Sequence, residues 1–122
     1  MYRFYNANSL GNFVNDCTIR AISLAEHTSW DETYAKMSEL ARLEGTMMDD
    51  KNFIIGYLDY NYERVPYLPY TVGEVAGEYP DCVLLITMPS HIVCSLFGTV
   101  YDSFDCRDKV AHEAWVVERK EI

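Results

Sequence analysis

The chain is short of basic residues, and this shortage limits what it can bind. Its 122 residues include ten Lys or Arg against nineteen Asp or Glu, so the formal net charge is -9. No basic cluster with interleaved aromatic residues occurs along the sequence. Because phosphate backbones and anionic membrane surfaces attract positive charge, we expect no nucleic acid and no membrane among the partners.

Long apolar runs are also missing. The longest, residues 82–88, is far shorter than the roughly 20 residues that a membrane-spanning helix needs. The first six residues lack the apolar stretch of a signal peptide. The sequence therefore predicts a cytoplasmic location.

Cysteine is scarce and irregularly spaced. The four cysteines are Cys17, Cys82, Cys94 and Cys106; they contain no C-x-x-C pair, and their spacing matches no common zinc pattern. A reducing cytosol opposes disulfides, so free thiols are expected. We predict no metal and no cofactor.

Glycine and proline are few, at six and four, while 49% of the residues are hydrophobic. Such a composition supports a sizeable core and does not indicate disorder. A length of this size fits one domain, here residues 1–122.

Capping patterns predict helices in the first part of the chain. The apolar spacing after Asn15 and Asp16 indicates a helix near 16–27, with one of these two residues as its cap. Ser29-x-x-Glu32 followed by helical apolar spacing indicates a second helix near 30–44. A third is expected after residues 49–50, and a short one after Thr71.

Strand signals dominate the last part. Residues 82–88 read as a strand buried on both faces, residues 91–97 and 99–102 as a hairpin, and residues 115–118 as a last strand. Helices followed by a hairpin-rich sheet indicate an α+β fold, with N-terminal helices packed on a C-terminal antiparallel sheet.

Cys17 lies at a position that favours the reactive thiolate form of its side chain. Cys17 lies at a predicted helix start, where free amides and the helix dipole favour a thiolate. A nucleophilic thiolate also needs a base and a group that orients it, and His91 and Asp102 are the natural candidates. If Phe97–Gly98 is a two-residue turn, both lie on one side of the hairpin; a bulge would separate them and favour Asp105 instead.

Three blocks then resemble a known family. Residues 15–21, 90–93 and 98–105 are similar to segments of the papain-like cysteine hydrolases in their small bacterial and phage-encoded forms. The resemblance implies a peptide or protein substrate, Cys17 as nucleophile, His91 as general base and then acid, and Asp102 as the orienting residue. For a phage-encoded chain it would place the activity in the host cytoplasm.

The likeness departs from the family at one position. Papain-like peptidases usually carry a Gln six residues before the cysteine as an oxyanion donor, and Gly11 stands there. Asn12 and Asn15 are the candidate replacements. A catalytically weak or inactive acidic binding protein on the same fold, such as a phage-encoded inhibitor or host-takeover factor, is therefore the alternative function.

Several of these residues also have a purely structural interpretation. Cys17 could be a small core residue. Arg20 could form an intrahelical ion pair with Asp16 or contact substrate. His27 and His112 are given no catalytic role. The tyrosines of the middle segment serve either core packing or a peptide groove; they are Tyr57, Tyr60, Tyr62, Tyr67 and Tyr70.

Overall fold

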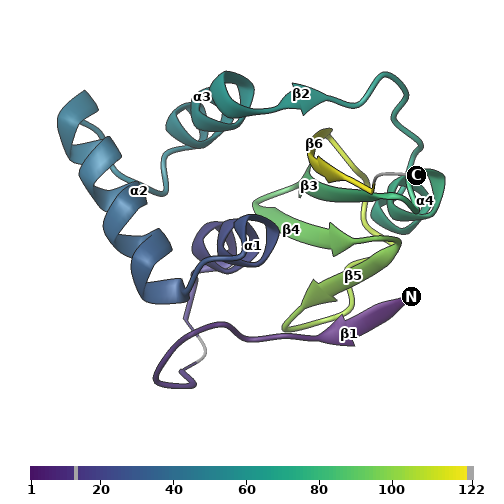
Figure 1. The fold of residues 1–122 in the computed structure, drawn as a ribbon, viewed down its shortest axis with the longest axis horizontal. Coiled ribbons are helices and arrows are strands. Elements are labelled where there is room, and N and C mark those ends of the chain that lie inside the picture. The colour runs from purple at the N-terminus through teal and green to yellow at the C-terminus, as the bar shows by residue number, and fades with distance from the viewer. Residues whose placement is uncertain (13, 121–122) are drawn as a thin grey trace.

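The structure is a computed structural model that describes residues 1–12 and 14–120. A mixed sheet forms its centre, with helices on both faces, and the fold is α+β (Figure 1). The helices are α1 (Cys17–Glu26), α2 (Trp30–Glu44), α3 (Lys51–Asn61) and α4 (Val72–Glu78). The strands are β1 (Tyr2–Phe4), β2 (Glu63–Arg64), β3 (Cys82–Met88), β4 (His91–Leu96), β5 (Thr99–Asp102) and β6 (Glu113–Arg119).

The sheet differs from the expected C-terminal antiparallel one at both of its edges. Its order is β1-β5-β4-β3-β6-β2, and β1 pairs with β5 in parallel while the other pairs are antiparallel. The predicted C-terminal strands pair antiparallel, but the whole sheet is mixed and is extended at its edges by β1 and β2 from the first part of the chain. Both unpredicted strands are too short to show a two-residue apolar period, and only long-range pairing defines them.

β3 separates two apolar clusters, which explains its uninterrupted hydrophobic sequence. Every residue of this strand is buried. Val83 and Leu85 belong to the cluster under α1, α2 and α3, whereas Leu84 and Ile86 belong to the cluster under α4. The helices therefore do not all cover one face, because α4 packs on the side opposite to α1.

Local capping explains where three of the helices begin. Ser29 and Glu32 form a reciprocal capping box at α2, and Thr71 and Glu74 form another at α4. Asp50 accepts a hydrogen bond from an amide of the first turn of α3. These side chains satisfy amides that the helix itself leaves unpaired, so the predicted helix starts are confirmed.

The β4–β5 hairpin closes with two residues and no bulge. Leu96 pairs with Thr99, and both Phe97 (φ 50°) and Gly98 (φ 90°) adopt left-handed backbone conformations. Positive φ at both central positions is the signature of the turn that suits the twist of a hairpin. Phe97 accepts this conformation although glycine or asparagine is usual there, and the register predicted from a two-residue turn is confirmed.

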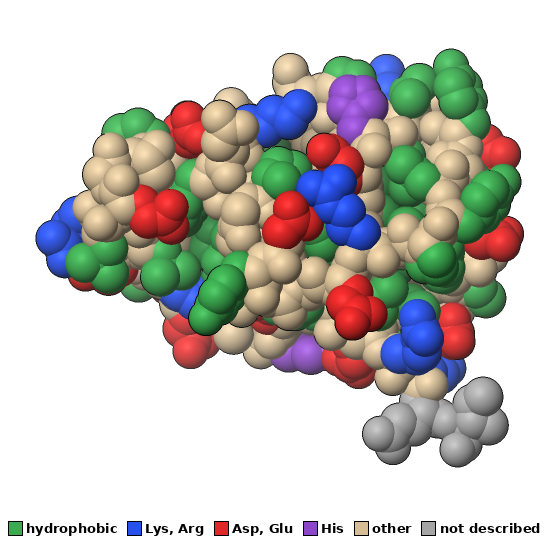
Figure 2. Space-filling model, turned by 90° about the horizontal axis from the view of Figure 1, so that it is seen from above, with side chains coloured by type: hydrophobic (Ala, Val, Ile, Leu, Met, Phe, Trp, Pro, Cys, Tyr) green, Lys and Arg blue, Asp and Glu red, His purple; other side chains and the backbone are tan. Residues whose placement is uncertain are grey.

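The surface carries charge of both signs. Figure 2 views the molecule from above relative to Figure 1, and on this face Lys and Arg side chains are scattered among acidic and apolar ones. Among the described residues, no helix combines the length and the apolar character required to cross a bilayer.

Candidate functional site

Cys17 is the first residue of α1, and the start of this helix is unlike the other three. Asp16 occupies the N-cap position, yet its side chain makes no capping hydrogen bond. The Asp16 carboxylate instead accepts hydrogen bonds from Arg20 and, at 2.8 Å, from Trp30 Nε1. Asp16 is therefore the cap residue by position, as one of the two predicted alternatives, but its side chain does not cap the helix, because a buried carboxylate is better compensated by a guanidinium than by one amide.

This arrangement leaves the first turn of α1 without a side-chain cap. The first hydrogen bond of the helix runs from the Arg20 amide to the Asp16 carbonyl at 2.9 Å. The amides of Cys17, Thr18 and Ile19 come before this bond, so they have no acceptor within the helix. Such amides carry the positive end of the helix dipole. They are available to stabilise negative charge beside the Cys17 sulfur.

The thiol of Cys17 is electrostatically activated. Burial opposes ionisation, but hydrogen bonds from His91 and from the Ile92 amide lower the pKa of Cys17 below the usual thiol range. The positive charge of Arg20 acts in the same direction. The thiol is only partly buried, so a reagent can reach it.

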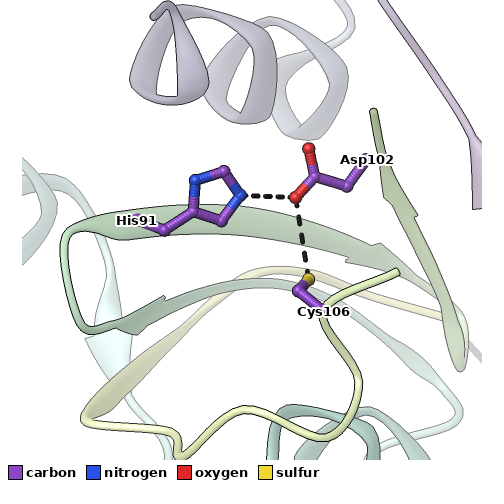
Figure 3. Close-up of side chains that lie close together, drawn as sticks. All are labelled: His91, Asp102 and Cys106. Carbon is purple, nitrogen blue, oxygen red and sulfur yellow. Dashed lines mark hydrogen bonds and ion pairs between the residues drawn. The ribbon is translucent and has the colours of Figure 1, made fainter. Parts of the chain in front are cut away.

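His91 begins β4 and lies between Cys17 and Asp102. Its Nε2 is 2.5 Å from Asp102 Oδ2 (Figure 3), and its ring is tilted against Phe104 with 4.9 Å between the centroids. Burial alone would lower the pKa of His91, but the hydrogen bonds to Asp102 and Cys17 raise it to about 9. With Nε2 engaged by Asp102, Nδ1 is the ring nitrogen left to serve Cys17.

Asp102 ends β5 and is almost completely buried, with 1% of its side chain exposed. Burial would raise the pKa of Asp102, but the hydrogen bond to His91 and the amide of Ser103 keep it below the ordinary range. Asp105, the alternative orienting carboxylate, pairs with Arg107 at 2.8 Å at the surface. Of the two candidates, Asp102 is the one hydrogen-bonded to the imidazole.

A cleft of about 580 Å³ opens in front of Cys17 and His91. Trp30 and Tyr34, whose rings stack at 5.2 Å, line it from α2, and Ile54 lines it from α3. The turn between β3 and β4 completes it on the other side. An apolar wall beside two convergent polar groups is the usual form of a small-molecule or peptide site.

The two asparagines proposed as oxyanion donors lie differently. Asn15 is exposed and lines the cleft. Asn12 is exposed outside the set of residues that line the cleft, and its carbonyl accepts a hydrogen bond from Asn6 at 3.0 Å. Gly11 lies in a turn closed by its amide and the Asn8 carbonyl.

One group of side chains resembles a metal site by composition. Within the described residues, ligand atoms of His91, Asp102 and Cys106 lie within 4.8 Å of one another (Figure 3). Three features disfavour a cation: His91 and Asp102 contact each other directly, Arg20 already binds the same carboxylate, and burial with nearby carboxylates raises the pKa of Cys106 to about 12. These residues therefore fit a hydrogen-bonded group better than a metal centre.

The remaining candidates lie away from the group formed by Cys17, His91 and Asp102. His27 ends α1 and lies 3.0 Å from Glu118, whereas His112 is exposed at the wall of the cleft. The hydroxyls of Tyr57 and Tyr62 donate to Glu26, which supports the packing interpretation of these two tyrosines. The other three tyrosines are Tyr60, Tyr67 and Tyr70, all exposed and outside the cleft lining.

Sequence reasoning missed two groups that matter here. Trp30 falls inside the helix predicted near residues 30–44, yet its indole binds the Asp16 carboxylate and its ring lines the cleft. The Ile92 amide helps to lower the pKa of Cys17, and no side-chain pattern encodes this backbone effect. Both depend on how α1 sits against α2 and β4, so only the three-dimensional arrangement reveals them.

Taken together, a thiol whose pKa is lowered by a neighbouring imidazole and a buried carboxylate hydrogen-bonded to that imidazole lie beside a cleft. This arrangement can carry nucleophilic attack by sulfur and proton transfer by the ring. Comparisons of the chain with family models, with curated proteins and with solved structures return no match.

Proposed function

We propose that this protein is a thiol hydrolase that cleaves a peptide, isopeptide or side-chain amide through Cys17, His91 and Asp102. The observation that carries the proposal is the 2.5 Å hydrogen bond between His91 and the buried Asp102, beside a Cys17 thiol whose pKa the same imidazole lowers. Cys17 and His91 both line the cleft. The proposal includes the papain-like relationship that the sequence blocks imply and a cytoplasmic site of action.

The acylation step follows from the protonation states of the site. The Cys17 thiolate attacks the carbonyl carbon of the substrate, and the carbonyl oxygen becomes an oxyanion. The free amides at the start of α1, with Asn15 at the cleft, are the groups available to stabilise that oxyanion. His91 then gives its Nδ1 proton to the leaving amine, and the C–N bond breaks to leave a thioester on Cys17.

Deacylation reverses the proton movement. The now neutral His91 accepts a proton from a water molecule, whose oxygen attacks the thioester carbonyl. The C–S bond breaks, the carboxylic acid product leaves, and Cys17 returns as a thiolate beside the imidazolium. Asp102 holds the ring orientation throughout and stabilises its charged form through Nε2.

The experiment is alkylation by iodoacetamide across a range of pH, with the modified cysteines identified by peptide mass spectrometry. We expect Cys17 to react fast at pH values where a free thiol, with a pKa near 8.5, is largely protonated. Cys94 and Cys106 serve as internal controls, because burial raises the pKa of both thiols. His91→Gln should abolish the fast reaction at low pH.

A complementary measurement detects the acyl intermediate. With p-nitrophenyl acetate we expect a stoichiometric burst of p-nitrophenolate and acetylation of Cys17, both lost in Cys17→Ser. An ordinary thiol titration of Cys17 in the folded wild type would refute the activated nucleophile. The alternative function, binding without catalysis, predicts that Cys17→Ala keeps full biological activity, and the net charge of -9 favours a basic partner in that case.

A further inference from the structure

A buried arginine joins the helix that carries the nucleophile to the strand that carries the orienting carboxylate. Arg20 lies one turn after Cys17 on α1, and only 8% of its side chain is exposed. Its Nη1 binds Asp16, and its Nη2 binds Asp102 Oδ1 at 2.8 Å. The guanidinium therefore bridges two carboxylates that lie 86 positions apart in the sequence.

We propose that Arg20 is a positioning residue of the triad: it fixes the Asp102 carboxylate against His91 and ties that carboxylate to the residue that precedes Cys17. The inference rests on the proposed function, because positioning has meaning only if Cys17 reacts.

The two oxygens of Asp102 have separate partners. Oδ1 accepts hydrogen bonds from Arg20 Nη2 and, at 2.7 Å, from the Ser103 amide. Oδ2 faces His91 Nε2 at 2.5 Å and receives a longer contact from the Cys106 thiol at 3.6 Å. Because the Arg20 guanidinium, the Ser103 amide and, more weakly, the Ser103 hydroxyl at 3.5 Å hold Oδ1, rotation of the carboxylate is restricted and Oδ2 stays directed at the imidazole.

The other end of the guanidinium binds the residue next to the nucleophile. Asp16 is 5% exposed at its side chain and is also held by Trp30. An arginine fork can bind two carboxylates at once, whereas a lysine ammonium acts as a point charge. One side chain thus sets the position of the α1 start relative to the end of β5.

Burial and charge argue against simpler roles. A surface ion pair four residues apart on a helix contributes little, but this pair is desolvated and shares its cation with a second element. Arg20 is outside the described residues that line the cleft, so the substrate-contact interpretation finds no support. Its effect must pass through Asp16, Asp102 and the nearby thiolate.

The effect of Arg20 on the pKa of Cys17 distinguishes a positioning role from a role in folding stability alone. The positive charge of Arg20 lowers the pKa of Cys17 and also that of Asp102. Removing this charge, and loosening Asp102 from His91, should both make the Cys17 thiolate harder to form. A residue needed only for folding would lower stability without moving the pH profile of the thiol.

The test compares Arg20→Gln and Arg20→Lys with the wild type in iodoacetamide alkylation across pH. We expect folded Arg20→Gln to alkylate at Cys17 roughly three- to tenfold more slowly at pH 7, with its profile moved to higher pH. Arg20→Lys keeps the positive charge but cannot bind two carboxylates as the guanidinium does. Its alkylation rate should therefore lie between those of the wild type and Arg20→Gln.

A matched control lies at the opposite end of α1. Glu26 there accepts hydrogen bonds from Lys36, Tyr57 and Tyr62, so Glu26→Gln also disrupts a polar network on this helix. We expect Glu26→Gln to lower the melting temperature while leaving the alkylation profile of Cys17 unchanged. Near-UV circular dichroism reports whether each variant is folded.

The outcomes separate the two proposals. An ordinary thiol profile in the wild type overturns the hydrolase proposal itself. An activated Cys17 in the wild type whose profile is unchanged in the folded Arg20 variants overturns only the positioning role. If Arg20→Gln does not fold, Arg20→Lys decides, because a wild-type rate in that variant contradicts the need for the bridging fork.

Discussion

Replacing Asp102 by asparagine removes one negative charge from the centre of the buried network without changing the size of the side chain. The substitution leaves Arg20 with Asp16 as its remaining carboxylate and leaves His91 with Cys17 as its remaining anionic neighbour. An amide can still fill the space and accept a hydrogen bond, so the fold is expected to persist. The measurable effect is the loss of the buried charge pairing.

The magnitude follows from the burial of the groups. Breaking a buried pair by removing one partner costs about 3–5 kcal/mol, because the other charge is left uncompensated. Here the side chains of Arg20 and Asp102 are 8% and 1% exposed. Asp16 still faces the guanidinium, so we expect about 3 kcal/mol, at the lower end of that range.

Urea unfolding monitored by circular dichroism measures this change. With a slope of about 1–3 kcal/mol per molar urea, the midpoint of Asp102→Asn should fall by about 1–3 M. The matched control is Asp105→Asn, which removes a carboxylate from an exposed pair with Arg107 in the loop that follows β5. We expect the control to unfold at the wild-type midpoint within experimental error.

The effect should also depend on pH in two directions. The pKa of Asp102 is lowered in the folded protein, so its ionised form stabilises the fold fully above the ordinary carboxyl pKa of about 3.9. This stabilisation is lost as pH falls through the folded-state pKa. The pKa of His91 is raised to about 9 in the folded protein, so its charged form stabilises the fold fully below the unfolded-state pKa of about 6.5. This stabilisation is lost as pH rises through about 9. The difference between wild type and variant should therefore be largest near pH 5 to 6.5.

Two results would refute this reasoning. One is a urea midpoint for Asp102→Asn equal to that of Asp105→Asn at pH 6, which would mean that the buried pairing contributes no net stability. The other is a difference from wild type that does not decline toward pH 9, which would mean that the charged imidazole is not coupled to Asp102.

Two further predictions concern the scaffold. Glu26→Gln should destabilise the fold by about 1–2 kcal/mol, because the carboxylate accepts charged or hydroxyl hydrogen bonds from residues that include Lys36 and Tyr57. This difference, measured by urea unfolding, should vanish as pH falls through the lowered pKa of Glu26, and its persistence in acid would contradict the explanation. Gly98→Ala should lower stability by about 1–2 kcal/mol in thermal unfolding, because Gly98 has a φ of 90° although ordinary space surrounds an added Cβ. Gly56→Ala, in an open position of α3, is its control and should stabilise by about 0.5–1 kcal/mol; equal effects of the two changes would show that backbone strain is not the cause.

Residues that interact within a few positions could be assigned before the fold was known. The Ser29 and Thr71 capping boxes occur as predicted, and the two-residue turn at Phe97–Gly98 is one of the two alternatives that the sequence left open. Each capping box is decided by hydrogen bonds inside one short segment, so the order of the residues is enough. The hairpin register that brings His91 to the side of Asp102 was left open between a two-residue turn and a bulge, and the structure decided it.

The sheet edges and the charge network depended on the tertiary structure. β1 is only three residues long and exists because β5 pairs with it from the far end of the chain. Asp16 reads locally as a helix cap, but burial beside Arg20 and Trp30 makes an ion pair and an indole hydrogen bond its better partners. Burial removes the Asp16 carboxylate from water, and this is why it pairs with Arg20 and Trp30 and does not cap the helix. No local sequence pattern indicates such burial.

The sequence by itself determined which residues could form a nucleophile, a base and an orienting carboxylate, since residue type and helix or strand position set their intrinsic chemistry. Only the tertiary structure decided that His91 lies against Asp102 and lowers the pKa of Cys17, and that Arg20 reaches Asp102 across 82 positions. The physical reason is that pKa shifts and buried ion pairs depend on distance and desolvation in space. Those quantities exist only once α1 has packed against the β4–β5 hairpin.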